Sequence, residues 1–340
     1  MKIAVDAMGG DFAPKVVVEG AVAAALEWGI PVILVGREEV ITEELKKCKA
    51  GNLPIEVCHA SEVIAMEESP SVALRKKKDS SIKVCFDLVK KDKASAMVSA
   101  GNSGAVMAHA VFILGRVEGI ERPAIAAVIP NLRKATILLD VGANVECKPL
   151  HLAQFALMGS VYAKYLFHVD KPKIGLLCNG EEESKGNELV RETHEVLKTS
   201  SLDYIGYVEG GDIFNGKVEV VVCDGFVGNV VIKSLEGLVY TVVGILKNGI
   251  EKSFFAKMGY AFGKKAFVDM RKKMDYSEFG GAPLLGVNGG VIITHGSANA
   301  KAIKNAVRMG YEYSANNVTQ KISEEILKNS DVLKLMKNKG

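Results

Sequence analysis

Six short segments of the chain combine glycine with polar side chains of the kinds that bind anions or take part in catalysis. They are residues 6–11, 99–105, 140–144, 179–188, 224–229 and 295–299. Glycine lets a phosphate approach the backbone, and the free N–H groups at the start of a helix attract negative charge. Lys185 adds a point charge, and His295 is followed by glycine and serine. A single such segment is most often only a helix cap, but together the six predict an anion-binding site.

None of these segments matches the Walker A loop or the G-x-G-x-x-G pattern of dinucleotide sites, so ATP and NAD are disfavoured as ligands. The six cysteines are scattered, with no C-x-x-C pair and no clustered histidines beside them. This spacing argues against a disulfide framework and against a structural zinc site. We expect the protein to use no cofactor and no metal.

An alternation of strands and helices must position the six segments. Short apolar runs predict strands at residues 3–6, 32–35, 55–58, 96–99, 125–129, 136–140, 174–178, 218–223 and 291–294. Helical patterns lie between them at residues 16–28, 81–91, 103–114, 150–167, 187–199, 227–247 and 298–316. The alternation predicts an α/β fold with a doubly wound, mostly parallel sheet. Because each segment follows a predicted strand, we expect all six to gather at one edge of that sheet.

Composition narrows the class of protein. Of 340 residues, 48% are apolar and 24% are charged, as in a soluble globular protein, and we expect one large α/β unit over residues 1–340. The net charge of +3 does not indicate a nucleic-acid binder. Asp6 lies too early for a secretory signal, and no run of about 18 uninterrupted apolar residues predicts a helix that spans a membrane. We expect a cytoplasmic protein.

Seven segments together resemble a known family. They are residues 5–11, 99–105, 122–125, 139–144, 179–186, 223–229 and 295–297. In this order they resemble the bacterial phosphate acyltransferase family (acyl-ACP:phosphate acyltransferase) of phospholipid synthesis, over residues 1 to about 320. The resemblance implies that a long-chain acyl group moves reversibly from acyl carrier protein to inorganic phosphate, and that a membrane glycerol-3-phosphate acyltransferase uses the acyl phosphate. It also implies a homodimer and a fold related to phosphotransacetylase and the isocitrate dehydrogenase group.

Such a reaction needs positioning and electrostatics rather than a protein nucleophile, because phosphate is already an anionic nucleophile and a thiol leaves readily. We hypothesise that Lys185 holds phosphate together with the backbones of residues 9–10 and 102–104, and that Asn229 donates to the thioester oxygen. Asp224 is expected to orient these groups, and His295 is a further catalytic candidate. The substrate-binding candidates are Asp6, Gly9, Gly10, Asp11, Gly101, Asn102, Ser103, Gly104, Asp140, Asn144, Gly186, Gly225 and Ser297.

Two other functions fit the same segments. One is a phosphotransacetylase-like enzyme that takes a short acyl group from acyl-CoA. The other is a non-catalytic module that binds an acyl chain or the carrier protein. The sheet-edge pattern by itself does not separate these functions from the first.

The charge of the chain is concentrated in one segment. Residues 252–273 hold seven basic side chains and one acidic one, whereas the other 318 residues hold 36 basic and 39 acidic ones. Within residues 248–274 we predict a helical protrusion of two short amphipathic helices that break near Gly263. Its expected contact residues are Phe254, Phe255, Met258, Phe262, Lys264 and Lys265. Three interpretations stay open: dimer packing, contact with an anionic membrane surface, and docking of acidic carrier protein. Membrane contact is favoured.

Just before this protrusion, an apolar repeat predicts a helix of the core or of a dimer interface. Its residues are Val227, Val231, Leu235, Leu238, Val242 and Leu246.

Overall fold

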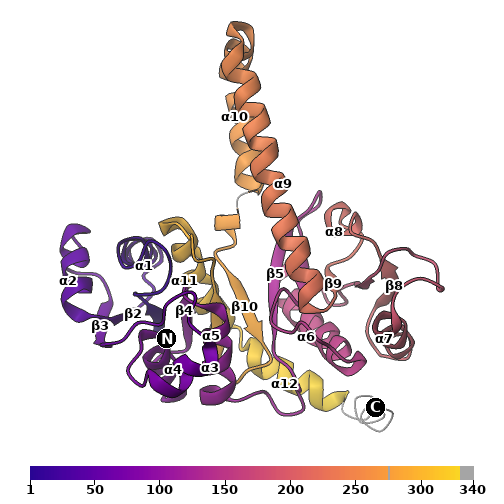
Figure 1. Ribbon diagram of the computed structural model, residues 1–340, viewed down its shortest axis with the longest axis horizontal. Coiled ribbons are helices and arrows are strands. Elements are labelled where there is room, and N and C mark those ends of the chain that lie inside the picture. The colour runs from indigo at the N-terminus through magenta and orange to yellow at the C-terminus, as the bar shows by residue number, and fades with distance from the viewer. Residues whose placement is uncertain (275, 330–340) are drawn as a thin grey trace.

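The computed structural model describes residues 1–274 and 276–329, which form an 11-stranded mixed sheet covered by helices (Figure 1). Its strands are β1 (Ile3–Asp6), β2 (Val32–Gly36), β3 (Ile55–His59), β4 (Ala96–Ser99), β5 (Ala124–Pro130), β6 (Ala135–Leu139), β7 (Ile174–Leu177), β8 (Tyr204–Val208), β9 (Val220–Val222), β10 (Ala282–Leu285) and β11 (Gly290–Ile293). Its helices are α1 (Lys15–Trp28), α2 (Glu38–Lys47), α3 (Pro70–Lys76), α4 (Ser81–Lys90), α5 (Ser103–His109), α6 (Pro149–Phe167), α7 (Glu188–Lys198), α8 (Asp212–Asn215), α9 (Gly225–Lys252), α10 (Phe254–Met274), α11 (Ala300–Ala315) and α12 (Val318–Lys328). The alternation confirms the predicted α/β class.

The order of the strands divides the sheet into two halves. It runs β3-β2-β1-β4-β11-β10-β5-β6-β9-β7-β8, and neighbours are parallel except at β11–β10, β10–β5 and β5–β6. Three reversals in succession invert the chain direction, so β6, β9 and β7 run opposite to β1, β4 and β11. The expectation that all six glycine-rich segments share one sheet edge is therefore wrong. Three follow strands of the first half and three follow strands of the second.

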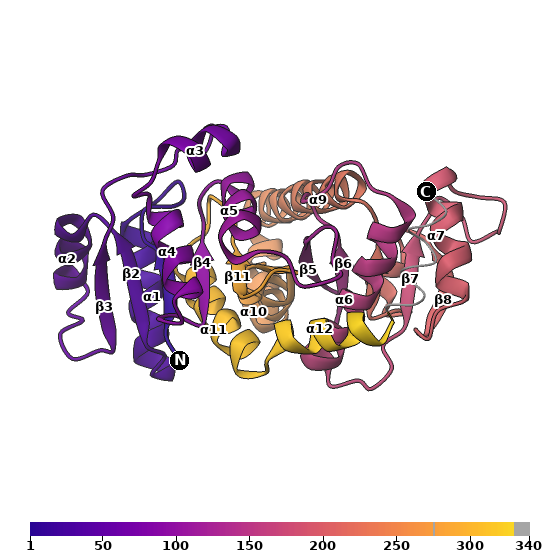
Figure 2. The same cartoon turned by 90° about the horizontal axis from the view of Figure 1, so that it is seen from below.

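Side chains alternate across the strands, and helices cover both faces of each half. In the first half, Ile3 and Val5 face α1 and α11, whereas Ala4 faces α4 and α5. In the second half, Ile137 and Leu139 pack on α6, while Leu138 packs on the first turns of α9. Figure 2 shows the two halves side by side, with α9 and α10 between them. Helix α9 begins in the second half, beside the loop that follows β6.

Helices α9 and α10 form a hairpin that projects away from the sheet (Figure 1). The apolar repeat of α9 is divided between two environments, since Val231 and Leu235 pack on the core while Leu238, Val242 and Leu246 are exposed. The predicted break near Gly263 is wrong: α10 is continuous, and the chain turns at Ser253. Ser253 has an extended backbone that ends α9, and its hydroxyl accepts the Ala256 N–H at 3.3 Å. Gly263 does not break α10, because one glycine inside a helix costs only about 1 kcal/mol.

Helix α9 also corrects the expectation about apolar length. By length and composition it is long enough to cross a membrane, and none of its most apolar stretch is buried in the chain. Lys233 and Glu236 interrupt the apolar sequence, which is why a search for uninterrupted apolar residues does not find it. Its first turns pack on the core, so only the projecting part is free to meet another surface.

Candidate active site

The segments that follow β1, β4 and β11 meet in a first loop cluster, residues 6–11, 99–104 and 295–297. Asp6 accepts a hydrogen bond from the Ser99 hydroxyl at 2.6 Å and one from the Met8 N–H at 3.2 Å. The Asp11 N–H donates to the Gly296 carbonyl at 2.8 Å, which joins the third segment to the first. The structure thus brings together the candidates from these three segments.

Asp6 holds this cluster in place rather than facing solvent. It is 1% exposed, and burial raises the pKa of its carboxyl, although hydrogen bonds from serine and backbone donors oppose the shift. Gly9 lies so close that an added Cβ would stand 2.4 Å from Asp6 Oδ2 and 2.7 Å from the Gly101 nitrogen. Gly9 is therefore required by packing. The exposed candidates of the cluster are Asp11, Ser103 and His295.

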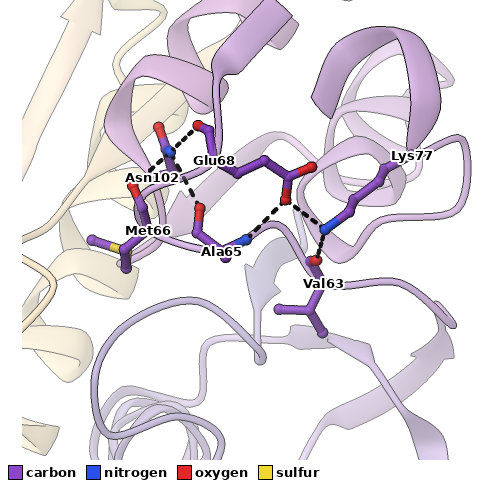
Figure 3. A network of polar contacts seen from close by, with 6 residues as sticks. All are labelled: Val63, Ala65, Met66, Glu68, Lys77 and Asn102. Atoms are coloured by element: carbon purple, nitrogen blue, oxygen red, sulfur yellow. Dashed lines mark hydrogen bonds and ion pairs between the residues drawn. The ribbon is translucent and has the colours of Figure 1, made fainter. Parts of the chain in front are cut away.

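Asn102 fastens the loop of residues 63–69 to the start of α5 (Figure 3). Its side-chain amide donates to the carbonyls of Ala65, Met66 and Glu68 at 3.3, 2.8 and 2.8 Å, and its oxygen accepts the Ala105 N–H at 2.9 Å. Glu68 is in turn bound by Lys77 at 2.5 Å. The amide of Asn102 is fully used, so this residue can contribute to ligand binding only through the backbone beside it.

A second loop cluster, residues 140–144 and 224–229, follows β6 and β9. Asp140 is fully buried and accepts four hydrogen bonds: from the N–H groups of Ile125, Ala143 and Asn144 at 2.9, 3.2 and 2.7 Å, and from the Asn144 amide at 3.0 Å. Burial is the main cause that raises the pKa of Asp140 to about 6. The same Asn144 amide donates to the Pro123 carbonyl at 2.7 Å. Asp140 and Asn144 therefore shape the loop from inside.

The start of α9 rests directly on this loop. Asp224 caps the helix by accepting the Val227 N–H at 2.8 Å, and the Gly225 N–H donates to the Asn144 carbonyl at 2.7 Å. An added Cβ on Gly228 would lie 1.9 Å from the Asp140 carbonyl oxygen, so only glycine fits there. Asn229 is exposed, and its side chain lies beside Gly142, at 3.7 Å from the position of a Cβ there. Asn229 is therefore the donor that this cluster presents to solvent.

Helix α9 connects the two clusters through a residue that the sequence analysis missed. Lys233 Nζ lies 3.1 Å from His295 Nε2 and 2.8 Å from Glu236 Oε2. Because an ammonium donates, Nε2 accepts, while Nδ1 accepts the Ser297 N–H at 3.2 Å and lies 2.7 Å from the Ser297 hydroxyl. Lys233 stands four residues after Asn229, so both lie on one face of the helix. That spacing is the signal that could have identified it.

The segment after β7 lies apart from both clusters in its contacts. Lys185 is exposed, and within residues 1–274 and 276–329 its ammonium makes no hydrogen bond or ion pair. The Asn179 side chain accepts the Gly186 N–H at 3.0 Å, and Asn187 caps α7. These contacts order the backbone of the segment. The assignment of Lys185 and Gly186 to phosphate binding stays a prediction.

Comparison with known proteins identifies the family. The model of a family described as "Fatty acid synthesis protein" matches residues 1–321. A phosphate acyltransferase of Geotalea uraniireducens is 61% identical over 329 residues, which cover 97% of this chain and 95% of that protein. A phosphate acyltransferase of Geobacter sulfurreducens is 58% identical over 326 residues, which cover 96% of this chain and 94% of that protein. The chain belongs to the phosphate acyltransferase family. It is accordingly an acyltransferase enzyme, and its resemblance to that family is confirmed.

Solved structures show the same fold at low sequence identity. A phosphotransacetylase from Streptococcus pyogenes superimposes with a TM-score of 0.61 at 18% identity, covering 93% of this chain and 94% of that one. The predicted relation of this phosphate acyltransferase family member to the phosphotransacetylase fold is thereby confirmed.

The cysteines near the second cluster are poor nucleophiles for an acyltransferase. Burial raises the pKa of Cys147 to about 12 and raises the pKa of the buried Cys223 thiol well above its usual range. A thiolate is the reactive form, so neither residue suits an acyl-cysteine intermediate. Among the described residues, no group of three or more histidine, cysteine or acidic side chains is placed to hold a metal ion. The site offers oriented donors and cations, which suits direct attack by a substrate nucleophile.

Proposed function

We propose that the protein transfers a long-chain acyl group from the thioester of acyl carrier protein to inorganic phosphate, and that the acyl phosphate feeds phospholipid synthesis. The observation that carries this proposal is the alignment on α9 of an exposed amide, Asn229, and a cation, Lys233, which contacts His295. Asn229 belongs to the second loop cluster, and Lys233 contacts the first through His295. An amide donor suits the oxyanion of an acyl transfer, and a cation beside glycine-rich backbone suits phosphate.

The proposed step needs no covalent intermediate on the protein. A phosphate oxygen attacks the thioester carbonyl carbon and forms the new C–O bond. The oxyanion of the tetrahedral intermediate accepts a hydrogen bond from the Asn229 amide. Collapse of the intermediate breaks the C–S bond, and the released thiolate takes a proton from solvent. The products are acyl phosphate and the free thiol of the carrier, and the same steps in reverse return the acyl group.

The donor is identified by comparing thioesters. The purified protein is incubated with phosphate and either palmitoyl carrier protein or acetyl-CoA, and acyl phosphate and free thiol are measured. We expect acyl phosphate from palmitoyl carrier protein. Preference for acetyl-CoA would instead indicate a phosphotransacetylase-like enzyme, and binding of the palmitoyl carrier without either product would indicate a non-catalytic module.

We further propose that the protein works on the inner face of the cell membrane, in the cytoplasm, where the membrane glycerol-3-phosphate acyltransferase can take its product. The tip of the hairpin supports this. Phe254, Phe255 and Phe262 are 72%, 81% and 87% exposed, and Met258, Lys264 and Lys265 are exposed as well. Exposed aromatic rings flanked by lysine suit an anionic lipid surface.

Liposomes test the hairpin proposal. We expect the wild type to sediment with vesicles that contain phosphatidylglycerol, and the Phe254→Asp, Phe262→Asp double variant to stay in solution. Leu26→Asp serves as the control, because Leu26 is exposed on α1 at 72% and lies outside the hairpin. Equal sedimentation of the wild type and the hairpin variant would reject lipid contact through these rings.

We propose a homodimer in which the exposed part of α9 packs against a second copy. Leu238, Val242 and Leu246 recur every four residues on one face and are exposed in the single chain. Sedimentation velocity should show a dimer for the wild type and a monomer for Leu238→Lys. A monomeric wild type would refute the dimer, and a dimeric variant would refute this interface.

A further inference from the structure

A polar cavity of about 620 Å³ opens between residues 116–122 and the start of α6. Its charged lining consists of Arg116, Glu121, Arg122 and Lys148, and His151 completes the polar wall. None of these residues has a role in the proposed acyl transfer. Residues 122–125 belong to the family resemblance, but neither loop cluster contains Arg122.

The charge of this cavity is positive. His151 is buried, its Nδ1 accepts the Lys148 N–H at 3.1 Å, and burial lowers the pKa of its ring. Its Nε2 lies 3.3 Å from Glu121 Oε2, and the Arg116 guanidinium donates to the Glu121 carbonyl. Within residues 1–274 and 276–329, the Arg122 and Lys148 side chains make no ion pair, although both line the cavity. Three cations thus face one carboxylate.

The cavity wall is held rigidly. Gln154, fully buried on α6, donates to the Gly119 carbonyl at 2.8 Å and accepts the Glu121 N–H at 2.9 Å. Because both ends of one side chain bind the segment of residues 119–121, the segment cannot collapse into the cavity without breaking two hydrogen bonds. A preformed cationic pocket binds an anion without the cost of ordering a loop.

The cavity adjoins the second loop cluster. Arg122 directly precedes Pro123, whose carbonyl accepts the Asn144 amide at 2.7 Å, and the Ile125 N–H donates to Asp140 at 2.9 Å. Lys148 follows Asn144 by four residues, so the Cα atoms of the two residues lie at most roughly 14 Å apart. A ligand anchored by Arg122 and Lys148 can therefore extend toward Gly142 and Asn229.

We infer that this cavity binds the phosphate of the pantetheine arm that carries the acyl thioester. The inference rests on the proposed function, since an acyl group bound to a carrier protein is presented on a phosphopantetheine arm. The phosphate lies at one end of the arm and the thioester at the other, which matches a cationic pocket beside the cluster that presents Asn229. Arginine is the side chain best suited to a phosphate, because its planar fork donates two parallel hydrogen bonds.

Two donors that differ only in the phosphate test the inference. They are palmitoyl-phosphopantetheine and palmitoyl-pantetheine, assayed with the wild type and with the Arg122→Gln, Lys148→Gln double variant. We expect the variant to raise KM for the phosphorylated donor at least tenfold, and to leave KM for the unphosphorylated donor and for inorganic phosphate within twofold. Lys164→Gln is the matched control, because Lys164 is an exposed cation on α6, which begins directly after Lys148, and it lies outside the cavity.

Two results overturn the inference and name what the cavity does instead. A rise in KM for inorganic phosphate with both donors would make it the acceptor site. A loss confined to palmitoyl carrier protein, with both free arms unaffected, would make it a contact for acidic side chains of the carrier.

Titration calorimetry with phosphopantetheine itself supplies a readout that does not depend on turnover. We expect the wild type and Lys164→Gln to bind it and the double variant to bind at least tenfold more weakly. Equal binding by all three overturns the inference even if acyl phosphate is formed. Loss of binding in the double variant alone supports the cavity even if the proposed reaction fails.

Discussion

The contact between α9 and the loop of residues 140–144 makes a quantitative prediction at Gly228. An alanine Cβ there would stand 1.9 Å from the Asp140 carbonyl oxygen, whereas real Cβ contacts are at least 3.0 Å and usually more than 3.4 Å. The start of α9 must therefore move away from the loop by roughly 1.1–1.5 Å. Such overpacking typically costs about 1–3 kcal/mol. Asn229 moves with the helix, and a displacement of about 1 Å can reduce a rate roughly 100-fold.

Gly228→Ala should thus lower the free energy of unfolding by about 1–3 kcal/mol in urea denaturation and reduce kcat/KM for acyl phosphate formation roughly 100-fold. Gly237→Ala is the matched control on the same helix, because nothing lies within 4 Å of its added Cβ. Alanine is the better helix former, so the control should gain up to about 1 kcal/mol and keep its activity. If Gly228→Ala matched the control in both assays, the close contact of α9 with Asp140 would be refuted.

Three further predictions concern the loops and helix α9. Burial raises the pKa of Asp140 from 3.8 to about 6, so the folded state loses stability as the pH rises through 6. The free energy of unfolding of the wild type, measured relative to that of Asp140→Asn, should fall by about 1.4 kcal/mol between pH 5 and 7.5. A difference between the two proteins that stays constant with pH would contradict the raised pKa. Asn102→Ala removes a cap and the amide that donates to three carbonyls, and it should cost about 2–4 kcal/mol in urea denaturation. The exposed cap variant Asn187→Ala should cost about 1 kcal/mol, and equal costs would refute the fastening role. Lys233→Ala should reduce kcat/KM about tenfold or more, whereas Lys247→Ala, at an exposed lysine further along α9, should leave it unchanged, and equal activity of both variants would remove Lys233 from the site.

Most of the fold was readable from the sequence because its strands are short apolar runs separated by glycine and by helix caps. The two strands that sequence reasoning missed contain residues that weaken a strand signal: Gly206 in β8 and Pro283 in β10. Missing β10 had a large effect. Without it, two of the three antiparallel pairings at the centre of the sheet, β11–β10 and β10–β5, are not predicted.

The site residues stay a prediction, but the structure shows where their side chains lie and what they contact. Asp6 and Asn144 are predicted to bind substrate, and the structure shows in addition that their side chains make hydrogen bonds that shape the loops. Burial of a carboxylate among backbone donors depends on tertiary packing, which local sequence does not reveal. Lys233 was overlooked because it lies two turns inside a helix, away from any glycine-rich segment. Only the three-dimensional path of α9 shows that it meets His295.

The central claim is that the protein joins inorganic phosphate to the acyl group of a carrier thioester. It is tested most directly by following labelled phosphate and free thiol together, with palmitoyl carrier protein as donor. The account predicts one molecule of labelled palmitoyl phosphate for each thiol released, with label transfer at least tenfold slower in Lys233→Ala. Thiol release without labelled product would show hydrolysis instead of transfer, and the absence of both products would contradict the proposed reaction.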